Sequence, residues 1–311
     1  MYLVCGEALF DVFTTSAPER SNRLTLEAVA GGSPFNVAIG LARMGTSVAL
    51  LGGISTDYLG EQLRRVLREE GVDPRHLATF DAPTTLAMVA LGSDGVPVYS
   101  FRGEGCADRL LQADQLPPLD DSIRGIHFGS YSLVTRPIAD ALAELLRREV
   151  EQRLISLDPN VRLNVEPDVA RWRERVEAFA ENAHLIKVSD EDIGLLYPGE
   201  APECIARRWL GHRAEIVIVT SGARGACLYS DRHGELHVAA PTVAVQDTVG
   251  AGDTFQAALL AFLAEHGFDS PQGLRDMGRQ EMDAMLRFAA QAAAITCSRR
   301  GPDLPYRSEI T

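Results

Sequence analysis

The chain has 311 residues, 46% of them hydrophobic, and its 43 acidic and 30 basic side chains give a formal charge of −13. This is a globular composition, and it argues against a nucleic-acid partner because such binding depends on clustered Lys and Arg. We find no signal-peptide pattern and no apolar run long enough to cross a membrane, so we expect a cytoplasmic protein. The five cysteines are scattered without paired spacing, which favours reduced, mostly buried thiols.

Short apolar segments alternate with segments of helical periodicity along most of the chain. The alternation predicts right-handed βαβ units, a largely parallel sheet and helices on both of its faces, which is an α/β fold. Strands are predicted at 2–6, 47–53, 125–129, 154–158, 184–188 and 215–220, and helices at 33–45, 57–70, 136–152, 167–182, 190–197 and 202–211.

Residues 84–102 interrupt this alternation. Two β-rich runs flank Ser93-Asp94-Gly95 with no helix between them, which is typical of a hairpin. Residues 12–16 and 23–30 could add two strands to it. Because the chain shows no repeat and no clear linker, we expect a small β appendage inserted into one large domain.

A glycine-rich turn, Gly250-Ala251-Gly252-Asp253, precedes a strongly helical apolar segment. Small residues at a helix N-terminus leave backbone amides free to bind an anion. Asp253 would repel a resting phosphate, so it is either a helix cap or a base that takes a proton from a hydroxyl during phosphoryl transfer. A Walker A loop is excluded because the only lysine, Lys187, is followed by Val188, and G-x-G-x-x-G fails at Phe255.

A second unusual cluster begins at the glycine pair of residues 31 and 32. The pair permits close approach of a ligand, or simply a tight turn, and Asn36 offers a donor and an acceptor that suit a polyol. Ser33 is a candidate cap for the helix that follows. Asp11 lies after the first strand, where it could accept hydrogen bonds from hydroxyls or be a solvated loop acid.

The segments GGSPFNVAIGLARMG (31–45) and DTVGAGDTF (247–255) resemble the two signature segments of the ribokinase-like, or PfkB, carbohydrate kinases. The resemblance extends over almost the whole chain. It implies a single catalytic domain over 1–311, with a small β-sheet lid inserted from about 12–30 and 84–108. It also implies an ATP-dependent sugar kinase, and a homodimer formed through the lid.

Carried over residue by residue, the resemblance makes Asp253 the catalytic base and Gly250, Ala251 and Gly252 the anion hole. It makes Asp11, Gly32 and Asn36 sugar contacts. Thr220, Gly222 and Gly225 match a nucleotide-binding loop, although the residues alone fit a simple turn into a hairpin equally well. The helical stretch 288–297 could pack an adenine, or be a buried core helix.

The family's N-x-x-E motif, which organises Mg²⁺ and its waters, is altered in this chain. Serine replaces asparagine at Ser189 and aspartate replaces glutamate at Asp192. The resemblance implies that Asp192 holds Mg²⁺ through water and that Ser189 lies at the nucleotide. Lys187 could reach a phosphate or face solvent. Some relatives bind K⁺ beside the anion hole, near the positions of Asp247 and Val249.

The stretches SFRGEGCADRLL (100–111) and LDPNVR (157–162) look like the fructokinase branch of the family. Arg102 and Arg162 could bind sugar hydroxyls, a nucleotide phosphate or a carboxylate, and a carboxylate would indicate 2-keto-3-deoxygluconate. Kinases for that acid tend to carry a tyrosine two residues before the lid arginine, where this chain has Ser100 next to Tyr99. Fructose is therefore the expected substrate. A catalytically silent sugar-binding protein on the same fold is the alternative from another class.

Overall fold

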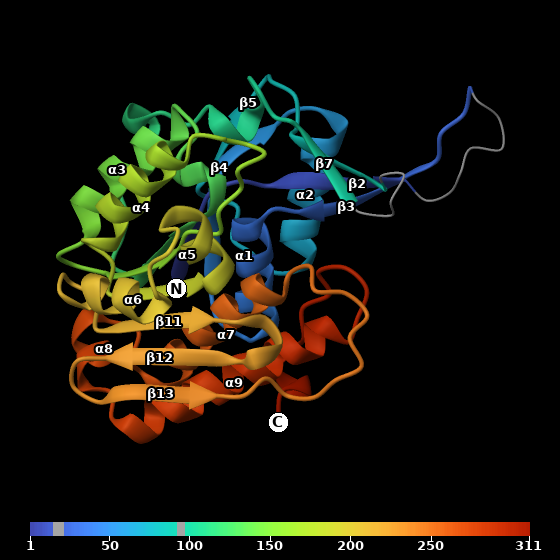
Figure 1. Cartoon of the computed structure of the whole chain (residues 1–311). Helices are drawn as coiled ribbons and strands as arrows, with labels where there is room; N and C mark the ends of the chain where they lie inside the picture. The colour runs from blue at the N-terminus through green and yellow to red at the C-terminus, as the bar shows by residue number, and fades with distance from the viewer. Residues whose placement is uncertain (15–21, 92–96) are drawn as a thin grey trace.

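The structure is a computed structural model that describes residues 1–14, 22–91 and 97–311. A large sheet runs through its centre (Figure 1). In order from one edge, the strands are β13 (Gly234–Val238), β12 (Ala226–Ser230), β11 (Ile216–Thr220), β10 (Leu185–Ser189), β9 (Leu154–Asp158), β8 (Gly125–Gly129), β1 (Tyr2–Cys5), β4 (Val48–Ser55) and β5 (Leu77–Phe80). In this order, the strands from β11 through β5 are parallel to one another, and β12 and β13 extend the sheet with antiparallel pairing.

Helices cover both faces of the large sheet because side chains alternate across each strand. In β1, Tyr2 and Val4 join one hydrophobic cluster, and Leu3 and Cys5 join the other. The first cluster packs on α1 (Ser33–Arg43), α2 (Tyr58–Glu69), α7 (Ala251–His266), α8 (Pro271–Asp276) and α9 (Arg279–Cys297). The second packs on α3 (Ile138–Glu149), α4 (Val169–Ala180), α5 (Asp190–Leu196) and α6 (Pro202–Leu210). The predicted α/β fold is confirmed.

A smaller second sheet projects away from this body (Figure 1). Its order is β3 (Leu26–Gly31), β2 (Leu9–Thr14), β6 (Leu86–Leu91) and β7 (Pro97–Arg102). The β6 and β7 strands pair antiparallel, as the hairpin prediction requires, while the turn at Ser93-Asp94-Gly95 lies outside the described residues. The two extra strands expected at 12–16 and 23–30 correspond to β2 and β3.

The structure corrects two expectations at the level of elements and burial. The β11 strand leads into the antiparallel pair of β12 and β13, which only the alternative interpretation of residues 220–225 as a turn into a hairpin indicated, and β5 was missed. All five cysteines are free, but only Cys5 and Cys106 are buried; Cys204 is exposed. Within the described ranges, we find no helix with the length and apolar character that a membrane crossing needs.

Candidate active site

Asp253 lies at the third position of α7 and is only 7% exposed. Its carboxylate accepts three hydrogen bonds from neutral side chains. Ser33 Oγ donates to Oδ1 at 2.6 Å, Asn36 Nδ2 donates to Oδ2 at 2.8 Å, and Asn160 Nδ2 approaches Oδ1 at 3.3 Å. The interpretation of Asp253 as a helix cap is wrong, because the N-cap of α7 is Gly250 and no side chain caps that helix. The carboxylate is instead oriented toward α1 and the segment after β9.

The N-terminus of α7 has the features of an anion site. Gly250 is left-handed, with φ 78°, and a Cβ there would lie 2.8 Å from Pro302 Cβ, so the turn requires glycine. Gly252 is exposed, and the amides of Gly252 and Asp253 have no acceptor among the described residues. Free amides at the positive end of a helix of 16 residues attract negative charge.

Lys187 lies beside this turn. A Cβ atom placed on Gly252 would be 3.1 Å from Lys187 Nζ. The ammonium donates a 2.8 Å hydrogen bond to Asp158 Oδ2, and both side chains are buried, so the expectation that Lys187 could face solvent is wrong. Burial raises the pKa of Asp158 to about 6, Lys187 opposes that rise, and the charges of Asp192 and Asp253 add to it. The only lysine of the chain therefore places its charge next to the N-terminus of α7.

Asp11 belongs to β2 and is largely enclosed, so the solvated loop acid is also wrong. Burial raises its pKa to about 6; the Arg162 guanidinium opposes this rise and the Asp253 carboxylate adds to it. Gly31 and Gly32 leave room here: a Cβ on Gly31 would lie 2.6 Å from Asp11 Oδ2, and one on Gly32 would lie 2.9 Å from a backbone oxygen. Asp11, Arg162, Asn36 and Asp253 thus surround one region.

The two arginines expected at the sugar differ in position. Arg162 is exposed, follows β9 and interacts electrostatically with Asp11, while its Nη1 donates to the Val161 carbonyl at 2.9 Å. Arg102 is also exposed and ends β7, where its backbone pairs with Leu86. Arg162 therefore approaches Asp11 from the large sheet, whereas Arg102 lies on the same second sheet as Asp11, two strands away.

The residues expected at the nucleotide follow two neighbouring parallel strands. Ser189 pairs with Thr220 in the register of β10 and β11, so both residues lie at the carboxyl ends of these two strands. The loop from Thr220 to Gly225 connects β11 to antiparallel β12, which fits the hairpin interpretation; Gly222 and Gly225 have φ of 50° and 96°. Their role at a nucleotide stays a prediction.

Ser189 and Asp192 are linked by the start of α5. Ser189 Oγ caps this helix by accepting from the Asp192 amide at 3.0 Å, and Asp192 Oδ1 accepts from the Val161 amide at 3.0 Å. No group of three or more possible metal ligands occurs among the described residues. The other carboxylate oxygen of Asp192 has no hydrogen-bond donor in the described part of the chain, which suits a contact to Mg²⁺ through water because Mg²⁺ usually keeps several waters.

Two further expectations concern the C-terminal part of the chain. The two carboxylate oxygens of Asp247 accept hydrogen bonds from backbone amides, one from Val249 at 3.1 Å and the other from Gly301 at 2.9 Å. The K⁺ site near Asp247 stays a prediction. The stretch 288–297 lies in α9, which packs against α7 with its alanines largely buried, as a core helix does. A hydrogen bond from the Gln246 amide to the Cys297 carbonyl joins the loop 239–250 to the C-terminal end of α9.

Sequence reasoning missed three residues of this site. Ser33 was expected to cap α1, but the N-cap is Gly32 and the Ser33 hydroxyl contacts Asp253. Asp158 and Asn160 follow the buried strand β9, and polar residues at the carboxyl end of a parallel strand are a signal that could have identified them. Asn160 has φ 43°, a left-handed conformation that asparagine tolerates.

The chain is similar to known sugar kinases over nearly its full length. Residues 1–309 match the model of the pfkB family carbohydrate kinases. A fructokinase of Rhizobium leguminosarum bv. trifolii is 38% identical over 85% of this chain and 79% of its own, and a probable fructokinase-6, chloroplastic, of Arabidopsis thaliana is 34% identical over 99% and 81%.

Solved structures give the same result. A fructokinase from Xylella fastidiosa with bound ATP aligns with a TM-score of 0.89 at 28% identity, covering 99% of this chain and 96% of that one. An aminoimidazole riboside kinase from Salmonella enterica, solved with aminoimidazole riboside and an ATP analogue, aligns at 0.81 and 25%, covering 99% and 97%. The chain belongs to the PfkB family of carbohydrate kinases.

Proposed function

We propose that this protein transfers the γ-phosphoryl group of ATP to a terminal hydroxyl of fructose. The observation that carries the proposal is the placement of Asp253, held by three neutral donors at the N-terminus of α7 and close to the ammonium of Lys187. The similarity to fructokinases, one of them solved with bound ATP, supports both the sugar and the nucleotide.

In this proposal the sugar hydroxyl donates a hydrogen bond to Asp253. As the hydroxyl oxygen attacks the γ-phosphorus, its proton passes to the Asp253 carboxylate, and the bond from the γ-phosphorus to the β–γ bridging oxygen breaks to release ADP. The amides of the turn from Gly250 to Asp253 and the charge of Lys187 stabilise the transferring group. Most of the catalysis then comes from positioning and charge neutralisation.

The other site residues divide between the two substrates. Asp11, Gly32, Asn36, Arg162 and Arg102 would contact the sugar, and Ser189, Thr220, Gly222, Gly225 and Lys187 the nucleotide. When bound, Mg²⁺ would neutralise charge on the ATP phosphates, with Asp192 holding it through water. A K⁺ ion near Asp247 would sit beside the anion hole.

We also propose that the chain is one catalytic domain whose second sheet, with the adjoining residues to about 108, is the lid over the sugar. The lid would exclude water that could otherwise hydrolyse ATP.

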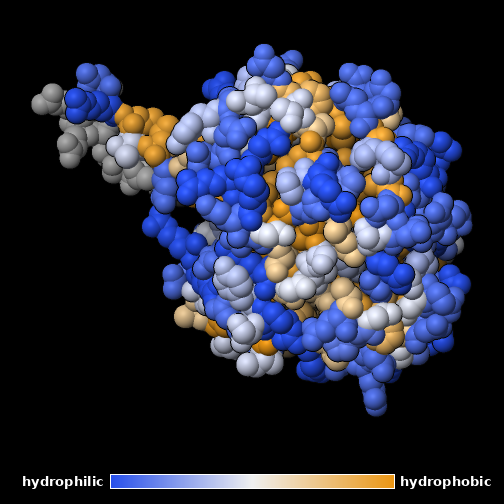
Figure 2. Space-filling view, turned by 180° about the vertical axis from the view of Figure 1, so that it is seen from behind, coloured by the Kyte–Doolittle hydropathy of each residue, from blue (hydrophilic) through white to orange (hydrophobic). Residues whose placement is uncertain are grey.

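Figure 2 shows hydrophobic side chains on the projecting part of this sheet, where Leu24 is 58% and Leu26 43% exposed. Such a surface on an edge strand supports a homodimer formed through the lid. The free cysteines support a reducing compartment, the cytoplasm.

A coupled ADP-release assay tests the proposal with fructose, 2-keto-3-deoxygluconate, ribose and aminoimidazole riboside. We expect the highest kcat/KM with fructose. Preference for 2-keto-3-deoxygluconate would reassign the substrate to a sugar acid recognised by Arg162 and Arg102. Saturable fructose binding without fructose-dependent ADP would show a silent binding protein and contradict the proposal.

The matched variant is Asp253→Asn, which keeps the size of the side chain but cannot accept the proton. It should lower kcat by about 10²–10⁴-fold, the range for general-base catalysis. Isothermal titration should find ATP and fructose still bound. A near wild-type kcat in this variant would exclude Asp253 as the base.

A further inference from the structure

The hydroxyl of Ser33 is used in an unexpected way. Ser33 is the first residue of α1, but Gly32 occupies the N-cap, and no side chain caps the helix. Ser33 Oγ donates to Asp253 Oδ1 at 2.6 Å and accepts from Asn160 Nδ2 at 2.8 Å. Three residues far apart in the sequence therefore meet at one oxygen of the candidate base.

The contacts on the two oxygens of Asp253 are unequal. Oδ1 accepts from Ser33 and, at 3.3 Å, from Asn160, whereas among the described residues Oδ2 accepts from Asn36 alone. An ionised carboxylate has about four acceptor positions, so the position left open is on Oδ2. Rotation of the carboxylate would break the two hydrogen bonds on Oδ1 and the one on Oδ2, so Oδ2 keeps one orientation.

Both donors to Oδ1 come from rigid parts of the backbone. Ser33 is followed by Pro34, whose ring restricts the chain at the helix start. Asn160 directly precedes Val161, and the Val161 amide is tied to Asp192 Oδ1 at 3.0 Å. The two side chains are therefore held in place before substrate arrives, as positioning of a catalytic group requires.

We propose that Ser33, supported by Asn160, is a positioning residue that fixes Asp253 so that Oδ2 faces the sugar hydroxyl. This inference rests on the proposed function, in which Asp253 is the base. We call Ser33 and Asn160 the Oδ1 clamp. Loss of the clamp leaves both substrates bound but lets the carboxylate turn away from the reacting hydroxyl, so its effect falls on kcat.

The kinetic test compares Ser33→Ala with Ser33→Thr. The alanine variant should lose about 10–100-fold in kcat, the equivalent of one hydrogen bond to a charged group, with KM for fructose and ATP within about twofold of wild type. Threonine keeps the hydroxyl and should restore kcat to within about threefold. Unchanged kcat in Ser33→Ala, equal losses in both variants, or a rise in the fructose KM alone would each overturn the proposal.

Asn160→Ala and the double variant test whether the clamp acts as a unit. We expect Asn160→Ala to lower kcat as well, and the double variant to be little slower than the slower single variant, because residues that act together are not additive. Fully multiplicative losses would show two independent roles and contradict the clamp.

Ser270→Ala is the matched control. Ser270 caps α8 by accepting from the Gly273 amide at 2.9 Å, and no contact to Asp253 involves it. This variant should lower Tm with kcat unchanged, whereas Ser33→Ala should lower kcat. A drop in kcat for Ser270→Ala equal to that of Ser33→Ala would mean that a general loss of stability explains both, and would overturn the proposal.

Crystal structures of the wild type and Ser33→Ala provide a readout that needs no activity. The Asp253 carboxylate should rotate in the variant, and an unchanged orientation would overturn the proposal. This separates the two failures: a wild type that phosphorylates no sugar defeats the proposed function, while the orientation of Asp253 still decides whether Ser33 positions it.

Discussion

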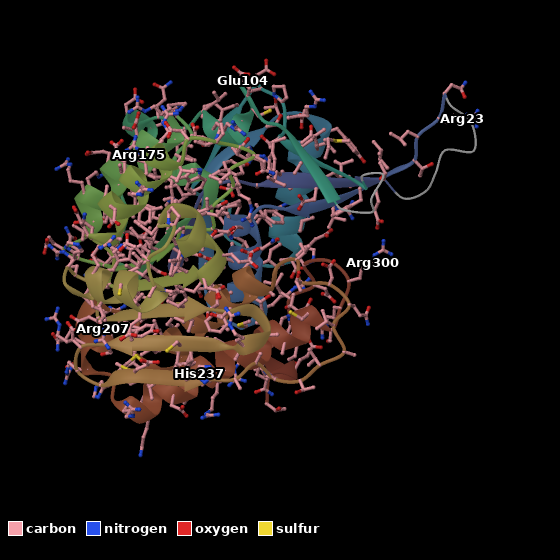
Figure 3. All side chains as sticks on the ribbon, viewed as in Figure 1. Arg23, Glu104, Arg175, Arg207, His237 and Arg300 are labelled. Carbon is pink, nitrogen blue, oxygen red and sulfur yellow. The ribbon has the colours of Figure 1, made fainter. Side chains whose placement is uncertain are left out.

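The two sheets differ in how they hold their charged groups. At the carboxyl end of the large sheet, Lys187 and Asp158 are paired at 2.8 Å, with side chains only 4% and 1% exposed. On the second sheet, Glu27 of β3 lies 3.9 Å from Arg300, and these side chains are 53% and 87% exposed. Arg300, in the C-terminal part of the chain, extends toward the second sheet (Figure 3).

The two ion pairs differ in how firmly they hold the elements that they join. A buried pair is costly to break because it leaves an uncompensated charge, whereas an exposed pair contributes about 0–1 kcal/mol. The Lys187–Asp158 pair is therefore held firmly, whereas the Glu27–Arg300 pair restrains the edge strand β3 only weakly. Variants at the two places should differ accordingly: those of the buried pair act on chemistry and stability, and those on the exposed edge strand β3 act on assembly.

Among the variants that compare the two sheets, the largest effect is expected from Lys187→Met. Removing the ammonium beside Gly252 takes away a charge that would face the transferring group, and kcat should fall by about 10²–10³-fold, as for the loss of one donor in an oxyanion hole. The KM for ATP should rise, while the KM for fructose should not. Steady-state ADP release measures all three quantities.

The double variant Asp158→Asn/Lys187→Met controls for damage to the fold. The single Lys187→Met variant leaves Asp158 buried without its partner, which costs about 3–5 kcal/mol, and removing both charges should recover much of that stability in urea unfolding. If the double variant also regains wild-type kcat, Lys187 has no role in the chemistry and only neutralises Asp158.

A smaller effect is expected from Glu7→Gln, measured as stability against pH. Glu7 is buried beside Gly32, bonded by Ser132, and burial raises its pKa from 4.5 to about 7. The folded state then holds a proton that the unfolded state has lost, so this group destabilises the protein as pH rises from about 4.5 to about 7. Relative to wild type, Glu7→Gln should gain stability over that interval, reaching about 3 kcal/mol at pH 8.

Urea unfolding at pH 5, 6, 7 and 8 measures this gain, and Glu265→Gln is the matched control. Glu265 is hydrogen-bonded by Arg307, which holds its pKa below the ordinary value, so it does not titrate in the same interval. A stability difference between Glu7→Gln and wild type that does not change with pH would show that Glu7 is ionised throughout.

Most of the large sheet could be predicted from sequence because its strands are buried on both faces and read as apolar runs ending in glycine or a polar residue. The β12 and β13 pair was indicated only by the hairpin alternative for residues 220–225, because β13 is short and exposes three of its five residues. The motif at 250–253 predicted the left-handed turn at the N-terminus of α7, since such a turn depends on local backbone geometry. These successes share one cause: the signal lies within a few consecutive residues.

The hydrogen-bond partners of Asp253 could not be predicted from local sequence patterns. Ser33 is 220 residues away from Asp253 in the sequence, and Asn160 is 93 residues away. From local sequence, a serine before Pro34 indicates a helix cap, and only the packing of α1 on α7 turns its hydroxyl toward the carboxylate. The expectation that Lys187 could face solvent was wrong for the same reason, because its burial in β10 depends on Asp158 of the neighbouring strand.

The smallest effect on activity is expected from Leu26→Asp on the second sheet. Leu26 is 43% exposed on the edge strand β3, and a charge there should prevent apolar pairing between two copies. Sedimentation velocity should show the mass falling from dimer to monomer, with kcat within about twofold of wild type, because Leu26 contacts neither Asp253 nor Lys187. Leu195→Asp on α5, at the same 43% exposure, should leave the mass unchanged. A wild type that sediments as a monomer would refute the dimer, and a dimer that persists in Leu26→Asp would place the interface on another surface.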